Sequence, residues 1–428
     1  LSSAASDVYK RQGTIAATDY NALQQGAVGD GKTLNTKSLQ SAIDALHAKG
    51  GGQLYFPAGR YLTGSLQLKS NVTLYLEKEA MLLGSTSPYD YPGFSTEKEL
   101  KVNNDHFDQA LIYAEGAENI GITGEGCIDG QGRELALTID SLHHTGELVD
   151  KHYNTYRKRP NTRPKLLFMR NCRKVELRKT NFRSGAAWGL SFSLCADLTI
   201  DSLHVENRAY WNNDGIDISD CKEVRISNCF INSADDGICL KSHNRGAWND
   251  RVSISNCHII SSASAIKFGT ESLGGFKNVT IDNIRIKDTF RSAIAIESVD
   301  GAEIENVKLE NIEIVCPGRA TRGMAYMSVS RLKDVPENEK GYPEFTMFEE
   351  LPSWGFYVRH VKGIQMHNVK LRLQEDDFRP AFVFDRVSDV RLSGISLPEN
   401  KKEGQVVLRQ TNLQSADDAV KEYITEVE

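Results

Sequence analysis

Short runs in which apolar and polar residues alternate recur along most of this chain. A step such as Val224-Arg-Ile alternates with a period of two residues, which is typical of a β-strand with one buried face. The steps begin at Val72, Ile120, Val175, Leu198, Val224, Val252, Val279, Ile304, Ile364 and Val390. Between Val175 and Ile304 successive steps lie 23, 26, 28, 27 and 25 residues apart, so one structural unit repeats.

Two further short strands complete each repeat. One set opens with asparagine, and the other opens with glycine or alanine. The first set begins at Asn228, Asn256, Asn283 and Asn311, and the second at Gly189, Gly215, Gly237, Ala265 and Ala293. Three strands without an intervening helix predict one coil of a parallel β-helix, in which the coils stack because none buries its apolar face alone. We therefore predict an all-β fold, a parallel β-helix solenoid.

A helix is predicted before the first coils. The stretch from Thr36 to His47 places Leu39, Ile43 and Leu46 on one helical face, and a glycine run ends it. An amphipathic helix at this place would cap the exposed N-terminal end of the core.

The interruptions of the repeat predict the domain organisation. We expect one β-helix domain over 13–428, with insertions at about 133–165 and 317–354 that form the walls of a cleft. The 60 residues between the eighth and ninth apolar steps suggest two coils plus an insertion. Residues 1–12 show no useful periodicity and are interpreted as an N-terminal remnant that is not native.

Charge and cysteine content narrow the choice of partners. The chain has 51 Lys and Arg against 57 Asp and Glu, a net charge of −6, whereas a nucleic-acid or anionic-membrane partner would need a basic excess. No apolar run approaches the roughly 20 residues of a membrane span. The cysteines form no Cys-x-x-Cys pair, and Cys172, Cys195 and Cys221 recur in register, which favours thiols stacked in the core over disulfides.

Aspartates gather at the strands that open with glycine. Asp214 and Asp236 directly precede that glycine in successive coils, and Asp235 precedes Asp236. Because neighbouring coils stack at about 4.8 Å, we expect Asp214 and Asp236 in one column with Asp235 beside them. Asp217 lies one strand step further along the coil of Asp214.

Carboxylates crowded in this way repel one another, which tends to raise one pKa and leave the other groups ionised. One protonated and one ionised carboxyl are what the acid–base hydrolysis of a glycosidic bond requires. Turn chemistry explains a single Asp-Gly, and a calcium site also suits several carboxylates. Three carboxylates on adjacent coils favour a catalytic function, because their repulsion is costly unless it is used.

The acidic motifs carry a resemblance to a known family. Asn212-Asn-Asp214-Gly and Asp235-Asp236-Gly resemble the Asn-x-Asp-Gly and Asp-Asp motifs of glycoside hydrolase family 28, the polygalacturonase family. The resemblance runs over about 19–397 and implies a right-handed β-helix that hydrolyses pectic glycans with inversion. By motif position, it implies that Asp235 is the general acid and that Asp214 and Asp236 activate the water.

The chain also departs from this family. Where the family usually has Gly-His-Gly, this sequence has Ala263-Ser264-Ala265, and where it usually has Arg-Ile-Lys, this sequence has Ala295-Ile296-Glu297. In the family those basic residues hold the carboxylate of a galacturonate next to the cleaved bond, as cations do. A glutamate there would repel it. The sugar at the cleavage site is therefore expected to be neutral or to lie at a chain end.

Other polar residues are candidates for substrate binding. Lys241 and Lys267 are expected in the columns of Glu297 and Ala295, and Tyr357 and Arg359 are expected to point outward from a later coil. Glu271 and Glu297 would suit hydrogen bonds to hydroxyls of a neutral sugar. The candidate substrate-binding residues are Asn212, Asp217, Lys241, Lys267, Glu271, Glu297, Tyr357, Arg359 and His360.

The sequence thus predicts an inverting glycoside hydrolase for a pectin-type or related plant polysaccharide, and the two insertions favour exo action. We expect a secreted or periplasmic monomer without cofactor or metal, acting on a polysaccharide or oligosaccharide. Two alternatives stay open. One is a polysaccharide lyase in which the aspartates bind calcium and Lys241 or Lys267 is the base. The other is a carbohydrate-binding solenoid, such as an adhesin, that binds glycan without turnover.

Overall fold

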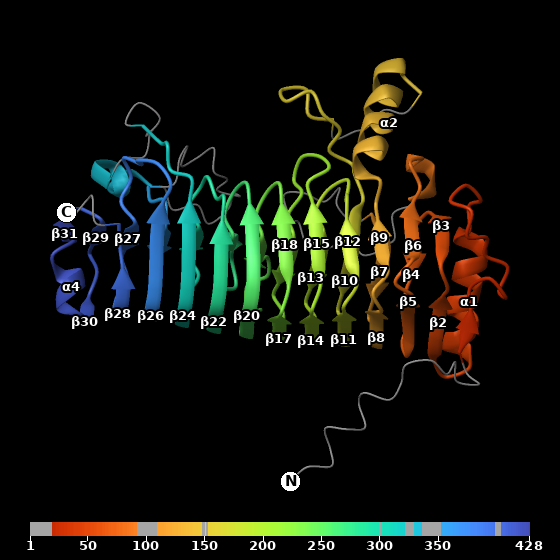
Figure 1. Cartoon of the computed structure of the whole chain (residues 1–428), viewed down its shortest axis with the longest axis horizontal. Helices are drawn as coiled ribbons and strands as arrows, with labels where there is room; N and C mark the ends of the chain where they lie inside the picture. Colours follow the sequence, from red (N-terminus) through yellow and green to blue (C-terminus); the bar gives the residue numbers. More distant parts are fainter. Residues whose placement is uncertain are drawn as a thin grey trace, which may run out of the picture.

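Strands from successive coils pair in parallel along the length of the molecule (Figure 1). The structure is a computed structural model, and it describes residues 19–91, 109–147, 150, 153–298, 301–321, 329–335, 352–398 and 404–428. Within these residues the strands form a twelve-stranded and a nineteen-stranded sheet. The fold is the predicted right-handed parallel β-helix. Residues 1–12 lie outside the described residues.

The twelve-stranded sheet takes one short strand from each coil. Its strands are β4 (Leu66–Gln67), β7 (Ala110–Glu115), β10 (Lys165–Arg170), β13 (Leu190–Ser193), β16 (Ile216–Ser219), β19 (Ile238–Ser242), β21 (Ile266–Ser272), β23 (Ile294–Glu297), β25 (Phe356–Arg359), β27 (Phe382–Asp385), β29 (Val406–Arg409) and β31 (Ile424–Val427). The predicted strands that open with glycine or alanine therefore all belong to this sheet.

The nineteen-stranded sheet takes the rest of each coil. Its strands are β1 (Tyr20–Asn21), β2 (Gly52–Phe56), β3 (Gly59–Thr63), β5 (Val72–Leu76), β6 (Ala80–Gly84), β8 (Glu118–Thr123), β9 (Cys127–Asp129), β11 (Arg173–Arg178), β12 (Asn181–Arg183), β14 (Ala196–Asp201), β15 (His204–Asn207), β17 (Lys222–Ser227), β18 (Phe230–Ser233), β20 (Asn249–Ser261), β22 (Phe276–Lys287), β24 (Ile304–Cys316), β26 (Val361–Leu373), β28 (Ser388–Ser396) and β30 (Leu413–Ala416).

Three strands per coil hold only for the earlier coils. From β20 onward the second and third strands are continuous, so most of these coils have two strands. Asn256, Asn283 and Asn311 mark predicted junctions, Asn368 marks a further one, and each has a positive φ of 52–54°. Asparagine tolerates this left-handed backbone, and the side chains hydrogen-bond from coil to coil, for example Asn283 Nδ2 to Asn256 Oδ1 at 2.8 Å. The chain therefore still bends at each asparagine, but the hydrogen bonding between strands continues across the bend.

The register corrects one repeat assignment. Val279 pairs with Val307, and Ile304 pairs with Phe276, so the apolar step of this coil begins at Val307 and not at Ile304. Val307 in turn pairs with Ile364, 57 residues later (364 − 307). Because β24 pairs directly with β26, the prediction of two coils plus an insertion is wrong. A single coil carries a long insertion here.

Stacked apolar side chains fill the space between the sheets. Along the nineteen-stranded sheet, one column reads Val175, Leu198, Val224, Val252, Val279, Val307, Ile364 and Val390, all buried. All eight cysteines are free, and the backbone N–H groups of Cys172 and Cys195 each lie 3.4 Å from the sulfur of the next cysteine in the column. The prediction of stacked thiols is confirmed.

Helices lie at the ends and edges of the solenoid. The helix α1 (Thr36–Ala48) covers the N-terminal end and buries Leu39, Ala42, Ile43 and Leu46, as predicted (Figure 1). The helix α2 (Gly132–Thr145) lies in the first interruption and projects away from the coils, and α4 (Asp418–Lys421) lies near the C-terminus. The short 3₁₀ helices are η2 (Pro88–Asp90) and η4 (Val329–Asp334). No helix in the described ranges is long and apolar enough to cross a membrane.

Candidate active site

Asp214 and Asp236 occupy equivalent positions in successive coils. They lie just before β16 and β19, and the N–H of Gly215 donates to the carbonyl of Asp236 at 2.9 Å. A Cβ on Gly215 would lie 2.4 Å from the carbonyl oxygen of Gly237 in the next coil. Glycine is therefore required after the aspartate for the coils to approach this closely. The predicted column of Asp214 and Asp236, with Asp235 beside it, is confirmed.

Two lysines reach back from the next coil to these carboxylates. Lys241 Nζ lies 2.9 Å from Asp217 Oδ1 and 3.6 Å from Asp214 Oδ2. Lys267 Nζ lies 3.2 Å from Asp236 Oδ2. Lys241 is 1% exposed and Lys267 is 6% exposed. Both cations therefore stabilise the chain's own carboxylates and are largely covered by it.

Asp235 and Asp236 are adjacent in the chain, but their pKa values are shifted in opposite directions. Burial raises the pKa of Asp235 above its ordinary value, and the charge of Asp236 raises it further. Burial alone would also raise the pKa of Asp236, but the positive charges of Lys267 and Arg291 outweigh it and hold the pKa low. The N–H of Ser264 also donates to Asp236 Oδ1 at 3.2 Å. One carboxyl of the pair thus favours the protonated form and the other the ionised form.

The pKa of Asp214 is shifted in the opposite direction from that of Asp236. Burial raises its pKa well above the ordinary value, and the nearby charges of Asp217 and Asp235 add to this effect. Its Oδ1 is buried and has no hydrogen-bond partner within the described residues. A base must be ionised to accept a proton, so in the unliganded site Asp236 fits that role better than Asp214.

Glu297, one of the predicted substrate-binding residues, is buried at the end of β23. It is 1% exposed, and its Oε2 finds no hydrogen-bond partner in the described part of the chain. Burial raises its pKa to about 7, against the opposing charges of Lys267 and Arg359. At mildly acidic pH its carboxyl is therefore largely neutral and able to donate as well as accept a hydrogen bond.

Tyr357 and Arg359 point away from the core, as predicted, but they are not on the surface. Phe356 and Val358 belong to the main core, whereas Tyr357 joins a separate apolar cluster on the outer face of the sheet. That cluster comprises Ala295, Leu332, Val335, Tyr357, Val383 and Val407. Arg359 is fully buried and donates to the carbonyl of Val335 at 3.3 Å. The segment 329–335 therefore covers this part of the face.

Asn212 holds the first interruption in place. Its Oδ1 accepts hydrogen bonds from Arg159 Nη1 at 2.6 Å and from Arg163 Nη2 at 2.9 Å. Arg163 is fully buried and also donates to the carbonyls of Ala186 and Trp211, both at 2.6 Å. These bonds attach the segment before β10 to the coil of Asp214, so Asn212 Oδ1 holds this segment in place.

The structure does not group two other candidates with the aspartates. Glu271 forms a buried ion pair with His243. His360 follows β25 at a corner of the coil and lines a separate pocket with Arg386 and Lys362. The aspartates precede the strands of the twelve-stranded sheet, whereas His360 follows one, so it lies at the other end of the strands.

Sequence reasoning missed three residues that interact with the predicted site residues. The charge of Arg291 acts on Asp235, Asp236 and Glu297. Arg163 anchors Asn212, and His243 pairs with Glu271. All three lie in loops, where no hydrophobic period marks a position, so no signal in the sequence could have selected them.

A β-helix with two adjacent carboxyls whose pKa values shift in opposite directions has the type of groups that glycoside hydrolases use. Residues 52–316, more than half of the chain, match the family described as glycosyl hydrolases family 28. The chain belongs to this family. Residues 20–83 also match a family described as rhamnogalacturonase A/epimerase, pectate lyase-like.

Individual relatives are similar over part of their length. A probable polygalacturonase of Vitis vinifera is 30% identical over 299 residues, which is 65% of this chain and 55% of that protein. An exo-poly-alpha-D-galacturonosidase of Dickeya chrysanthemi is 28% identical over 248 residues, 51% of this chain and 41% of that protein. The chain thus spans about half the length of the curated relatives it matches.

The comparison with solved structures supports the fold. A family 28 exopolygalacturonase of Yersinia enterocolitica aligns with a TM-score of 0.65 and 22% identity, over 95% of this chain and 76% of that chain.

Proposed function

We propose that this chain is an inverting glycoside hydrolase that acts on a pectin-type plant polysaccharide. The adjacent pair Asp235 and Asp236, with opposite pKa shifts, carries the proposal. Asp235 donates its proton to the leaving oxygen as general acid, and Asp236 accepts a proton from the attacking water as general base. Asp214 lies in the same column and binds the water as it becomes hydroxide-like.

We further propose that the sugar beside the cleaved bond is neutral. Ser264 Oγ and Glu297 Oε2 are buried and have no hydrogen-bond partner in the described ranges. Such atoms cost about 1–3 kcal/mol each unless a ligand or water satisfies them. Sugar hydroxyls both donate and accept hydrogen bonds and could satisfy each of these atoms, whereas a substrate carboxylate beside an ionised Glu297 would be repelled.

Action at a chain end is supported by what covers the face on both sides. Arg159 and Arg163 fix one segment against the coil of Asp214, and 329–335 covers Ala295 and Tyr357 further along. Among the described residues, the coils of β19 and β21 lie between these two covered parts, and a site bounded on both sides suits a chain end more than the middle of a polymer. Such an enzyme works where the polymer is, so we propose that it is secreted or periplasmic.

The lyase alternative is less well supported. In the described residues, no group of three His, Cys, Asp or Glu is arranged to hold a metal ion. Lys241 already contacts Asp214 and Asp217, and Lys267 contacts Asp236, so cations of the chain itself already pair with the carboxylates that a calcium ion would need. A lysine base would have to leave its carboxylate partner before it could accept a proton.

Stereochemistry tests the proposed function directly. We expect digestion of a panel of pectic polysaccharides and oligosaccharides to release short products from the start, with the inverted anomer formed first. The inverting reaction needs the acid and base carboxyls about 6.5–9.5 Å apart, with room for water, against about 5–5.5 Å in a retaining enzyme. Proton NMR and product masses make the measurement. A retained anomer, a trapped glycosyl-enzyme or an unsaturated product would contradict the mechanism.

The pH profile tests the pairing of Lys267 with Asp236. Lys267→Met removes the cation that holds the pKa of Asp236 low, so burial should dominate and the pKa should rise. Because Asp236 must be ionised, activity should then be lost at a higher pH as the solution is acidified. The pKa of the alkaline limb, which belongs to Asp235, should rise by less. Lys267 also lowers the pKa of Asp235, but burial and other charges influence that pKa more.

The measurement is kcat/KM against pH on the best substrate of the panel. Lys277→Met is the matched control, because Lys277 lies on β22 against the Trp248 ring, in the other sheet. A uniform loss of activity at every pH, with both limbs in place, would mean that Lys267 acts only on structure.

A further inference from the structure

Two large aromatic side chains are exposed at the turns that lead into the twelve-stranded sheet. Trp211 lies in the turn before β16 and Phe290 in the turn before β23, and each is 53% exposed. Among the residues that the structure describes from β10 onward, no other large apolar side chain is exposed. Single exposed apolar residues are common on protein surfaces, so the position of these two matters more than their exposure.

Both residues lie at the strand ends where the aspartates lie. Trp211 is three residues before Asp214, so the Cα atoms of these two residues lie within about 11 Å of each other. Phe290 precedes Arg291, whose charge acts on Asp235. The coils follow in the order β16, β19, β21, β23, and Asp235 precedes β19, so it lies between the two aromatic residues. Three coil steps place the two turns about 14 Å apart along the solenoid.

The turn that carries Trp211 is held by neighbouring segments. Arg163 Nη1 donates to the carbonyl of Trp211 at 2.6 Å, and the guanidinium of Arg159 lies over the indole, 5.2 Å from its centre. Two residues further on, the buried Asn213 donates from Nδ2 to the carbonyl of Ala187 at 2.7 Å. The indole is therefore supported by the chain, while about half of its surface faces solvent.

The turn that carries Phe290 is held in a comparable way. Thr289 and Ser292, on either side of it, are buried. Thr289 Oγ1 lies 3.1 Å from Cys316 Sγ, and Ser292 Oγ donates to the carbonyl of Ser353 at 2.7 Å. A flat ring that is exposed on a fixed backbone loses little conformational freedom when it binds a ligand.

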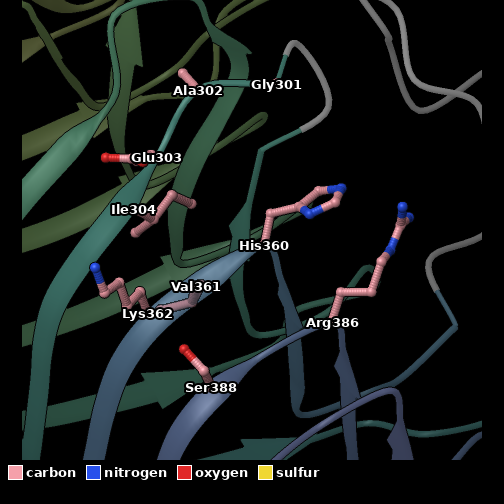
Figure 2. Close-up of a pocket in the computed structure, with 9 residues that line it drawn as sticks. All are labelled: Gly301, Ala302, Glu303, Ile304, His360, Val361, Lys362, Arg386 and Ser388. Carbon is pink, nitrogen blue, oxygen red and sulfur yellow. The ribbon is translucent and has the colours of Figure 1, made fainter.

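Other aromatic groups of the chain are less suited to bind a ligand. Of the four tryptophans, Trp188 and Trp354 are buried and Trp248 is half-buried. The pocket that His360 lines has no tryptophan, tyrosine or phenylalanine among its nine lining residues (Figure 2). Within the described coils from β10 onward, the exposed tryptophan and phenylalanine rings thus lie at the edge that carries the aspartates.

We propose that Trp211 and Phe290 are stacking platforms that bind two sugar rings of the substrate, one on each side of the cleaved bond. The C–H groups on one face of a pyranose ring pack against the flat face of an aromatic side chain, while the hydroxyls at the edge of the sugar stay hydrated or bond to polar groups. The inference rests on the proposed function, because that function places the reacting glycosidic bond beside Asp235.

Binding to a chain without turnover tests the proposal. In an Asp235→Asn background, isothermal titration calorimetry with a rhamnogalacturonan hexasaccharide gives Kd. Trp211→Leu and Phe290→Leu should each raise Kd about three- to tenfold, because leucine is apolar but has no flat face. Trp211→Tyr and Phe290→Tyr keep a flat ring and should stay within about twofold. The double leucine variant should lose the product of the two factors, because sites about 14 Å apart act independently.

Phe230→Leu is the matched control. Phe230 lies on β18 in the other sheet, and its ring stacks on that of His204 with 4.7 Å between the ring centres, so its replacement should leave Kd unchanged. Fluorescence gives a second readout, because all four tryptophans are among the described residues and Trp211 alone is exposed. Bound hexasaccharide should shield the tryptophan emission from quenching by acrylamide, and this shielding should disappear in Trp211→Tyr.

Three results would overturn the proposal. They are unchanged Kd in both leucine variants, equal losses in the leucine and tyrosine variants, and no binding of any pectic oligosaccharide of the panel. A glycosyl fluoride fills only one side of the reacting bond, so slower hydrolysis of the fluoride in both leucine variants of the active chain would contradict the placement on opposite sides.

Turnover by the chain with Asp235 intact separates this proposal from the proposed function. Hydrolysis with inversion that ignores both leucine substitutions would leave the hydrolase in place and remove the platforms. Binding that depends on both rings, without any turnover, would contradict the hydrolase and leave a glycan-binding surface.

Discussion

Replacing Asp235 by asparagine is expected to lower kcat by about two to four orders of magnitude, the usual contribution of a general acid. Asparagine keeps the Oδ1 that accepts the N–H of Asp236 at 3.1 Å, so the local backbone should hold. It has no acidic proton to give to the leaving oxygen. The loss should be much smaller on a glycosyl fluoride of the same sugar, because fluoride leaves without protonation.

The control for this variant is Asp282→Asn. Asp282 is also half-buried, lies on β22 of the other sheet and accepts a hydrogen bond from Asn311 at 2.8 Å. Circular dichroism and thermal unfolding should show both variants folded. Near-normal turnover of Asp235→Asn on the natural substrate, or an equal loss on the fluoride, would remove Asp235 from the acid role.

Unmodified polygalacturonate is expected to be a poor substrate, at least about a hundredfold below a branched, rhamnogalacturonan-type pectin in kcat/KM. Ser264, Ala295 and Glu297 stand where family 28 usually has basic residues. Each missing charge-assisted hydrogen bond costs about 1.5–3 kcal/mol, and about 1.4 kcal/mol is tenfold in rate. Loss of two such contacts gives the expected factor.

The preference should also depend on pH. The pKa of Glu297 is raised to about 7 by burial, so its carboxyl is mostly neutral at pH 5 and mostly ionised at pH 8. Repulsion of a galacturonate carboxylate should therefore grow as the pH rises through 7. The measurement is the ratio of kcat/KM on the two polymers between pH 5 and pH 8. Glu297→Gln should flatten it, and methyl-esterified polygalacturonate should be insensitive to the ionisation.

Fast cleavage of polygalacturonate would require a cation at another position to bind the uronate. Fast cleavage of polygalacturonate that Lys267→Ala or Arg291→Ala abolishes, with cleavage of the branched pectin retained, would show that another cation holds the uronate. Lys241, Lys267 and Arg359 are buried against the chain's own groups, whereas Arg291 is half-buried and acts electrostatically on Asp235 and Asp236. Arg291 would then be the cation to examine first.

Much of the fold was predictable because a solenoid repeats a local rule. A period of two residues marks each strand, and stacking places equivalent residues of successive coils in columns. The alignment of Asp214 with Asp236 followed from this rule alone. The rule gave the wrong start for the coil at Ile304. This apolar residue lies three positions before Val307 and has the same pattern as the start of a strand. The rule also failed for the 57 residues before Ile364, because length does not separate a coil from an insertion.

The sequence by itself determined the β-helix, its N-terminal cap, its ladder of thiols and the column of aspartates, because each depends on pattern and spacing within neighbouring coils. Only the tertiary structure decided which carboxyl is ionised, since the pKa of Asp236 depends on Lys267 from the next coil and on Arg291 from a loop. It also decided that 329–335 buries Tyr357 and Arg359, and that His360 turns into a separate pocket. The charge and the burial of a site depend on groups that are far apart in the sequence, so no periodic pattern in the sequence predicts them.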